Sequence, residues 1–324
     1  MKILVVGCGN IGSRHLQGLL KYQDHDLFID VFDPDFSALK LGEKRACEIE
    51  TSRSHKVDYH SNFVELDSVY DLVVHTTTAQ VRMKSISLLS QVVSSKLWIL
   101  EKIISQSTAQ LNAIQKMLDN ADVFVNHWMR STKWAADIKM ELASLSDNMV
   151  SFEVSGSSWG MLCNTLHWVD LIEFLLDTKI QAIHFSHQKY LTWIDAKRTG
   201  FKEALGEYMI TFNNGTTLQI KCDNNLPYSE NMRIFTQNSE TILELNYINA
   251  SEIQLQGFGK ELRFPQDLQS DMSKKFPKVY YDAVNQTGLT PLTEAATTHA
   301  VFLDALLVQW NGYTSESQHC VPIT

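Results

Sequence analysis

A short apolar strand that breaks at a glycine-rich turn is the feature of this 324-residue chain that most constrains its fold. Residues 2–6 form the strand, residues 7–12 read G-C-G-N-I-G, and the sequence then becomes helical. In such a turn the first glycine permits the tight bend, the second admits a pyrophosphate and the third lets the helix approach the strand. The helix amides then face the phosphates, so the pattern predicts a dinucleotide-binding unit. The predicted cofactor contacts in the turn are Gly7, Gly9, Asn10, Ile11 and Gly12.

A second apolar run, residues 28–32, ends at Asp33, about 20 positions after Gly12, which suits a carboxylate that binds the adenosine ribose. Asp33 can accept hydrogen bonds from both ribose hydroxyls but would repel a 2′-phosphate. The next residues, Pro34 and Asp35, supply no arginine to neutralise that phosphate. The sequence therefore predicts NAD as the cofactor, with NADP disfavoured. The alternative is that Asp33 merely begins an Asp-Pro turn.

Length and composition restrict the class of protein. The chain is longer than one typical domain, and its 44% hydrophobic and 20% charged residues are ordinary for a globular protein. A net charge of −9 with scattered basic residues argues against nucleic acid as a partner. The longest apolar runs are too short for a membrane span or a signal peptide, so we expect a cytoplasmic protein. The five cysteines are odd in number and widely spaced, which predicts reduced thiols. The histidines show no zinc-ligand spacing, which predicts no metal.

The pattern of expected strands and helices differs between the two parts of the chain. Strand-like runs at 71–74, 97–100 and 123–125 alternate with helical stretches at 80–93 and 108–118, which predicts a parallel, doubly wound Rossmann sheet. From about residue 149 the strand-like runs are 151–155, 207–212, 217–221, 232–236 and 241–245, with helices at 165–176 and 291–309. These predict an α+β domain with a large, mostly antiparallel sheet. The expected domains are 1–126, which binds the dinucleotide, and 127–324, which binds substrate and forms oligomers.

The end of the strand at 97–100 carries the first catalytic candidate. Ligands of a doubly wound sheet bind beyond the carboxyl ends of its strands, and Glu101 and Lys102 stand at this point. Lys102 is therefore placed where the nicotinamide end should lie, although a strand-end lysine can also be a simple solvated charge. Thr76, which follows the strand at 71–74, and Glu101 complete the predicted cofactor contacts.

The first helix of the second domain carries the other candidates. His167, Asp170 and Phe174 follow at i, i+3 and i+7 and so share one face of that helix. His167 could act as an acid or base. The alternative is a buried histidine that Asp170 satisfies.

In combination these pieces resemble the glucose-fructose oxidoreductase and myo-inositol dehydrogenase family, Gfo/Idh/MocA, over nearly the whole chain. Glu101-Lys102 matches the family's Glu-Lys-Pro motif, His167 and Asp170 match the end of its Asp-x-Gly-x-His-x-x-Asp motif, and Arg130 follows the sixth strand. The resemblance implies an NAD-dependent oxidoreductase that transfers hydride from a secondary hydroxyl of a sugar, polyol or nucleotide sugar. It also implies a homodimer or homotetramer that pairs through the outer face of the second sheet.

The resemblance further implies a role for each catalytic candidate. His167 would accept the hydroxyl proton, Lys102 would stabilise the developing alkoxide, and Asp170 would orient the imidazole or a substrate hydroxyl. Glu101 would hold Lys102. The predicted substrate contacts are Lys102, Arg130, Asn164 and His167, with Trp128 and Lys133 on the same side or, for Lys133, on the solvated rim.

The chain also departs from the family pattern. Ile103 replaces the proline of the first motif, so we expect a trans peptide bond, because a cis bond before a non-proline residue costs about 2.5–4 kcal/mol. Cys163 and Thr165 replace the aspartate and glycine of the second motif, and Thr77 and Val81 occupy the proline and histidine positions of a third pattern. We interpret Cys163 as a small wall residue and not as a nucleophile.

Loss of the carboxylate at position 163 leaves two interpretations. Asn164 could hydrogen-bond a sugar hydroxyl and cap the helix, while chemistry rests on Lys102 and His167. Alternatively, the site is degenerate and the protein is a regulator that binds NAD and a sugar. The presence of both Lys102 and His167 favours the enzyme.

Overall fold

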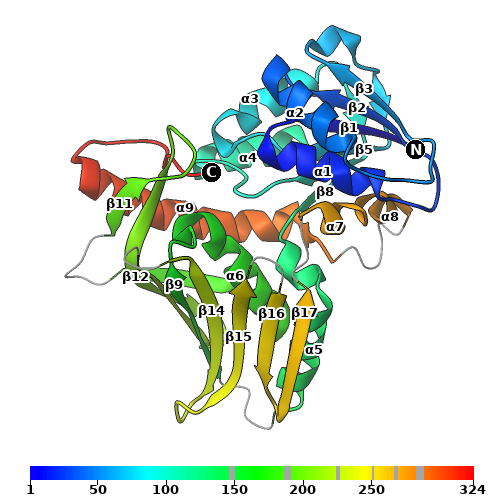
Figure 1. The fold of residues 1–324 in the computed structure, drawn as a ribbon. Helices are drawn as coiled ribbons and strands as arrows, with labels where there is room; N and C mark the ends of the chain where they lie inside the picture. The colour runs from blue at the N-terminus through cyan, green and yellow to red at the C-terminus, as the bar shows by residue number, and fades with distance from the viewer. Residues whose placement is uncertain (146–149, 186–190, 224–226, 250–251, 266–268, 282–287) are drawn as a thin grey trace. The chain divides into compact units, whose positions relative to one another are not determined.

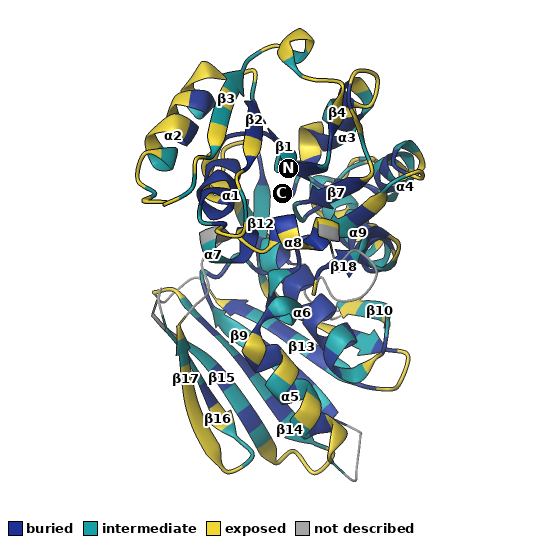
Figure 2. Cartoon of the chain, turned by 90° about the vertical axis from the view of Figure 1, so that its right-hand side faces the viewer, coloured by how far each residue is buried: buried dark blue, intermediate teal, exposed yellow. Residues whose placement is uncertain are grey.

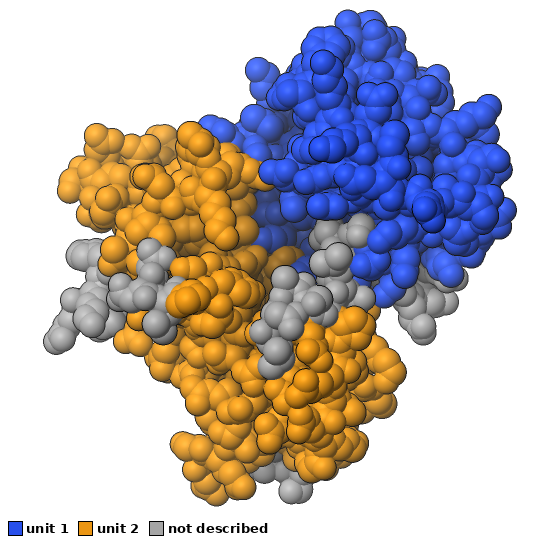
Figure 3. Space-filling model, in the orientation of Figure 1, with its two compact units in different colours: residues 1–105, 109–128, 267–294 blue, residues 106–108, 129–266, 295–324 orange. Residues whose placement is uncertain are grey.

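The computed structural model describes residues 1–145, 150–185, 191–223, 227–249, 252–265, 269–281 and 288–324 (Figure 1). The chain forms two compact units (Figure 3). Unit 1 comprises residues 1–105, 109–128 and 267–294, and unit 2 comprises 106–108, 129–266 and 295–324. The expected division after residue 126 places 267–294 in the second domain, whereas in the structure this segment belongs to unit 1.

Unit 1 is built on a parallel sheet, which confirms the predicted Rossmann architecture. Its strands are β1 (Lys2–Val6), β2 (Phe28–Phe32), β3 (Lys56–His60), β5 (Leu72–His75), β7 (Leu97–Leu100) and β8 (Asp122–Val125). They lie in the order β8-β7-β5-β1-β2-β3, and the short β18 (Thr290–Pro291) adds antiparallel to β8. A separate small pair joins β4 (Val69–Tyr70) to β6 (Ser94–Ser95). The apolar strands are buried because helices cover the sheet (Figure 2).

Three of the four helices of the Rossmann unit lie where the sequence predicts a helix, and α2 does not. They are α1 (Asn10–Leu20), α2 (Phe36–Ala46), α3 (Ala79–Leu89) and α4 (Thr108–Met117), with a short turn, η1 (Phe63–Glu65). Asp35 caps α2 by accepting a hydrogen bond from the Ser37 amide. This helix and β3 escaped prediction, because α2 buries only Leu39 and Gly42 and so shows a weak apolar stripe.

Residues 269–281 join unit 1 by packing on α1. They form α7 (Gln269–Ser273) and α8 (Phe276–Tyr281), and Figure 1 shows α7 beside α1. Phe276 stacks on His15 at a centroid distance of 5.4 Å, and Lys21 pairs with Asp271 at 2.9 Å. These contacts explain why the segment belongs to unit 1.

Unit 2 is built on a large sheet in the order β10-β12-β13-β9-β14-β15-β16-β17, with β11 paired to β12. The strands are β9 (Val150–Ser157), β10 (Ile180–Phe185), β11 (Thr192–Asp195), β12 (Lys202–Phe212), β13 (Thr217–Asp223), β14 (Ser229–Thr236), β15 (Thr241–Asn249), β16 (Glu252–Gly257) and β17 (Lys260–Pro265). Within the described part of this second sheet only β9 and β13 pair in parallel, so the prediction of a mostly antiparallel sheet is confirmed.

The helices that lie wholly or mostly in unit 2 are η2 (Trp128–Ser131), α5 (Lys133–Ala143), α6 (Met161–Leu176) and α9 (Leu292–Thr314). The two faces of the sheet differ. Tyr208, Ile210 and Phe212 are buried on one face, whereas the other carries Glu153 in ion pairs with Lys221 and Arg233. Across the described residues, no helix has both the length and the apolar character of a membrane span. These described residues also contain no cluster of three or more His, Cys, Asp or Glu side chains that could bind a metal ion.

Candidate active site

The glycine-rich turn has the geometry that a pyrophosphate requires. Gly7 has φ +89°, a conformation that L side chains rarely adopt, and its amide donates to Phe32 O at 2.8 Å. A Cβ built at Gly9 meets no heavy atom of the described residues within 4 Å, so the backbone there is open to a ligand. Asn10 and Ile11 are exposed at the start of α1. These residues fit a dinucleotide phosphate group.

Gly12 fills a different role from Gly9. A Cβ built at Gly12 would lie 1.9 Å from Gly7 O and 2.5 Å from Thr76 Oγ1. Thr76 itself donates to Gly7 O at 2.7 Å and so supports the turn from β5. Thr76, predicted as a cofactor contact, therefore lies against the turn that would hold the cofactor.

We expect Gly12→Ala and Gly9→Ala to separate folding from binding. At Gly12 the added methyl meets backbone that cannot move aside, so unit 1 should lose about 1–3 kcal/mol or more and bind NAD poorly. At Gly9 the methyl occupies open space, so stability should hold while NAD affinity falls. Thermal unfolding and calorimetric NAD titration measure both effects. Equal unfolding temperatures for the two variants would contradict the contact at Gly12.

Asp33 follows β2 and is half-buried beside the turn. Its Oδ2 accepts a hydrogen bond from the Cys8 amide at 2.7 Å, and its Oδ1 accepts one from the Asp35 amide at 2.9 Å. The second bond is the Asp-Pro turn of the alternative interpretation. The first brings the carboxylate to the glycine-rich turn, as a ribose-binding residue requires. The hydrogen bonds of Asp33 are therefore compatible both with a ribose-binding carboxylate and with an Asp-Pro turn.

Glu101 lies at the end of β7 in a hydrogen-bonded network. His15 Nε2 is 2.8 Å from its Oε1, and Asn126 Nδ2 donates to the same oxygen at 2.6 Å. On its other side, His15 Nδ1 lies 2.7 Å from Ser273 Oγ. Burial acts to raise the pKa of Glu101, but His15, Asn126 and the charge of Lys102 outweigh burial and lower the pKa. The carboxylate is thus fixed in its ionised form beside Lys102.

Sequence reasoning missed His15, Asn126 and Ser273. His15 is separated from Glu101 by 86 residues and from Ser273 by 258, so no local pattern links them. The available signal was a histidine on the buried side of α1, because buried polar side chains need partners.

The peptide bond between Lys102 and Ile103 is cis, so the expectation of a trans bond was wrong. The surroundings of the bond account for the difference. Ile103 is fully buried, and Arg82 donates to the carbonyl oxygens of Glu101 and Ile103, on either side of Lys102. Lys102 itself is half-buried.

Helix α6 begins at Met161, before the predicted start at 165, and Gly160 at φ +71° precedes it. The expectation that Asn164 caps the helix was therefore wrong, because Asn164 lies inside the first turn and donates to Trp159 O at 2.6 Å. The helix start is satisfied from β12 instead. Glu203 accepts hydrogen bonds from the amides of Leu162 and Cys163 at 2.8 and 2.9 Å. A carboxylate thus lies beside position 163, although the residue there is cysteine.

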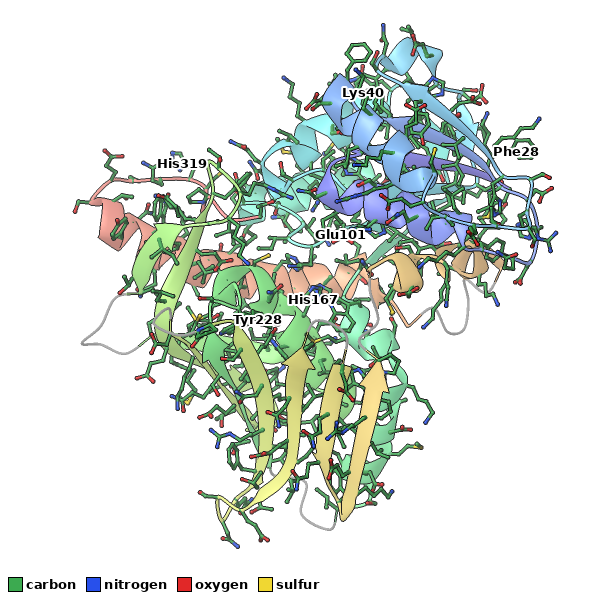
Figure 4. The ribbon with its side chains drawn as sticks, in the orientation of Figure 1. Phe28, Lys40, Glu101, His167, Tyr228 and His319 are labelled. Carbon is green, nitrogen blue, oxygen red and sulfur yellow. The ribbon has the colours of Figure 1, made fainter. Side chains whose placement is uncertain are left out.

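His167 and Asp170 lie on α6 and are almost fully buried (Figure 4 labels His167). Asp170 Oδ2 is 2.9 Å from Arg130 Nε, and the Arg130 guanidinium also lies over Phe174. Arg130, which the sequence predicts to contact substrate, is paired with Asp170 in the structure. Lys133 is largely exposed and pairs with Asp137 one turn along α5.

The predicted site residues divide between the two units. Unit 1 brings the glycine turn, Asp33 and Thr76 together and fixes Glu101 and Lys102 on the same sheet. Unit 2 brings Arg130 and Asp170 together and carries Asn164 and His167 on the same helix as Asp170.

No protein-family model and no curated protein matches the sequence. Solved structures match the fold. An oxidoreductase from Agrobacterium radiobacter, in complex with NAD+, L-tartaric acid and magnesium, has a TM-score of 0.66 at 14% identity, covering 96% of this chain and 97% of that one. The myo-inositol dehydrogenase of Lactobacillus casei, in complex with NAD(H) and myo-inositol, has a TM-score of 0.66 at 13% identity, covering 98% and 95%.

A third match belongs to a different functional class. The super-repressor mutant of Gal80p from Saccharomyces cerevisiae has a TM-score of 0.67 at 11% identity, covering 96% of this chain and 97% of that one. The chain therefore has the fold of Gfo/Idh/MocA-type oxidoreductases, as the resemblance predicted. At these identities the likeness establishes the fold, and function has to be argued from the site.

Proposed function

We propose that this protein is a nicotinamide-dinucleotide-dependent oxidoreductase that acts on a secondary hydroxyl of a sugar, polyol or nucleotide sugar. One observation carries the proposal. Lys102 follows β7 and the glycine turn follows β1, and both strands end at the same edge of one parallel sheet, with β5 between them. That edge is where doubly wound sheets bind dinucleotides.

The proposed chemistry assigns one task to each side chain. When bound, the nicotinamide accepts a hydride from the carbon that carries the hydroxyl. His167 accepts the hydroxyl proton, and Lys102 stabilises the negative charge that develops on the oxygen. Arg130 holds Asp170, which orients His167 or a substrate hydroxyl. Asn164, Trp128 and His167 contact substrate in this proposal.

NAD is the proposed cofactor, held by Gly7, Gly9, Asn10, Ile11 and Gly12. Asp33 supports this assignment because its carboxylate lies beside the turn and would repel a 2′-phosphate. Thr76, which follows β5, and Glu101, which follows β7, are the other proposed cofactor contacts.

Asp33→Ala is expected to weaken NAD binding about 10- to 100-fold, the equivalent of losing charged hydrogen bonds, and to affect NADP much less. Any damage to the turn from loss of the Cys8 contact acts on both cofactors. The ratio of the NAD dissociation constant to the NADP dissociation constant therefore reports only the loss of the contact between Asp33 and the ribose. An unchanged ratio, or a wild-type preference for NADP, would overturn the assignment.

A substrate screen tests the proposed function. Wild-type protein is incubated with NAD and a panel of polyols, sugars and nucleotide sugars, and absorbance of the reduced nicotinamide is followed. We expect reduction with at least one member, and none from Gly9→Ala, which should fold but bind NAD poorly. A panel member that raises the melting temperature but never reduces NAD would contradict the enzyme.

That outcome would favour the second candidate, a regulator that binds NAD and a sugar without turnover. The Gal80p match supports this candidate, because its structure is that of a repressor. So do Cys163 and Thr165, which depart from the family motif. Retention of Lys102, with its anchored neighbour Glu101, supports the enzyme.

Assembly and location remain predictions. The resemblance predicts a homodimer or homotetramer that pairs through the outer sheet face, and the short apolar runs of the sequence predict a cytoplasmic protein. Met209 is exposed on that face, and Glu153 with its two basic partners lies there too. A monomeric mass at micromolar concentration would contradict a stable oligomer.

A further inference from the structure

Arg82 is a buried arginine on α3 that no sequence motif explains. It is 1% exposed and lies in the same buried stripe as Ile86 and Leu89. A guanidinium keeps its charge at any ordinary pH, so a buried one needs hydrogen-bond acceptors around it. The acceptors that surround Arg82 therefore show what it does.

Three of these acceptors are backbone carbonyls. Nη1 donates to Glu101 O at 2.5 Å and also to Ile103 O, and Nη2 donates to Thr77 O. Glu101 O and Ile103 O flank Lys102, so one nitrogen of Arg82 holds the chain on both sides of the lysine. Thr77 follows Thr76, whose hydroxyl supports the glycine turn through Gly7 O.

We propose that Arg82 is a positioning residue that fixes the backbone of Lys102 relative to the dinucleotide turn. The proposal rests on the proposed function, in which Lys102 stabilises charge on the substrate oxygen. Glu101 provides an independent anchor, because its side chain is held by His15 and Asn126. Arg82 instead holds the main chain, and its contact with Ile103 O restrains the far side of Lys102.

The planar guanidinium group of arginine suits these three hydrogen bonds. Two guanidinium nitrogens serve three carbonyls from two chain segments at once, which a lysine ammonium on a flexible stem reproduces poorly. Arg82→Lys keeps the charge and loses the planar group, and Arg82→Met keeps the length of the stem and loses both. The two variants therefore separate charge from geometry.

A double-mutant cycle tests the proposal through turnover. Misplacement of a catalytic group by about 1 Å can cost about 100-fold, so Arg82→Met should lower kcat at least 10-fold and leave NAD affinity unchanged. In a Lys102→Met background the same change should cause no further loss, because the group it positions is already gone. Equal losses in both backgrounds would show a merely structural role and overturn the proposal.

Tyr70→Phe is the matched control. It removes a 2.6 Å hydrogen bond from the buried Tyr70 to Asp30 in the same unit, away from Lys102. We expect it to lower the melting temperature and leave kcat unchanged. If Arg82→Met does not fold, Arg82→Lys enters the same cycle, with an intermediate loss expected.

A second measurement needs no substrate. Limited reductive methylation followed by peptide mass spectrometry gives the reactivity of Lys102 relative to the exposed Lys133. Release of the Lys102 backbone should raise this ratio several-fold in Arg82→Met and Arg82→Lys and leave it unchanged in Tyr70→Phe. An unchanged ratio in the arginine variants would overturn the proposal. A wild-type protein without turnover would contradict the proposed function, and the labelling ratio would still decide the role of Arg82.

Discussion

Turnover by Lys102→Met is expected to fall about 100- to 1,000-fold, the loss typical of removing one group that stabilises an oxyanion. Methionine matches the length of lysine and carries no charge. NAD affinity should stay unchanged, because the glycine turn and Asp33 hold the cofactor in the proposed site. Steady-state kinetics on a substrate from the screen, with calorimetric NAD titration, measure the two quantities.

Lys133→Met is the control for the loss of one positive charge. Lys133 is exposed and pairs only with Asp137 among the contacts described, so its replacement should not change turnover. If Lys102→Met behaved like Lys133→Met, Lys102 would be the solvated strand-end charge of the alternative interpretation.

His167→Ala is expected to lower turnover about 100- to 10,000-fold, the contribution of a positioned general base. It should also remove the limb that a histidine base gives to the pH-rate profile between about pH 5 and 8, because only the neutral imidazole accepts a proton.

His184→Ala provides the comparison. His184 lies on β10 in the same unit and is exposed, with its Nε2 3.2 Å from Thr211 Oγ1. We expect its replacement to leave both turnover and the pH profile unchanged. A His167→Ala enzyme that kept the same pH limb would show that another group removes the proton.

The features that sequence predicts well are local ones. The strand before the turn, Gly7 at its positive φ and the parallel sheet follow from periodicity and from the special freedom of glycine. The antiparallel sheet of unit 2 follows from runs of alternating residues with turn signals between them. Boundaries are less determined, as the start of α6 shows. There a carboxylate from β12 satisfies the first amides, about 40 residues away in sequence.

The features that sequence misses depend on contacts between distant segments. Glu101 was identified by its place after a strand, but its partners His15 and Asn126 come from α1 and the end of β8. Arg82 belongs to no recognised sequence motif. The peptide bond between Lys102 and Ile103 is cis although a bond before a non-proline residue prefers trans, and the residues around it include Arg82, which donates to Ile103 O. Both cases show that a polar residue on a buried helix face is the signal to look for.

The most direct test of the central claim follows the carbon-bound hydrogen itself. Wild-type protein is incubated with NAD and the panel of polyols, sugars and nucleotide sugars, each deuterated on carbon, and the mass of the nicotinamide cofactor is recorded with the melting temperature. We expect reduced cofactor that carries deuterium from at least one member, and much less of it with Lys102→Met and His167→Ala. Cofactor that stays oxidised and unlabelled, while a panel member raises the melting temperature, would contradict an oxidoreductase and establish a ligand-binding protein of the same fold.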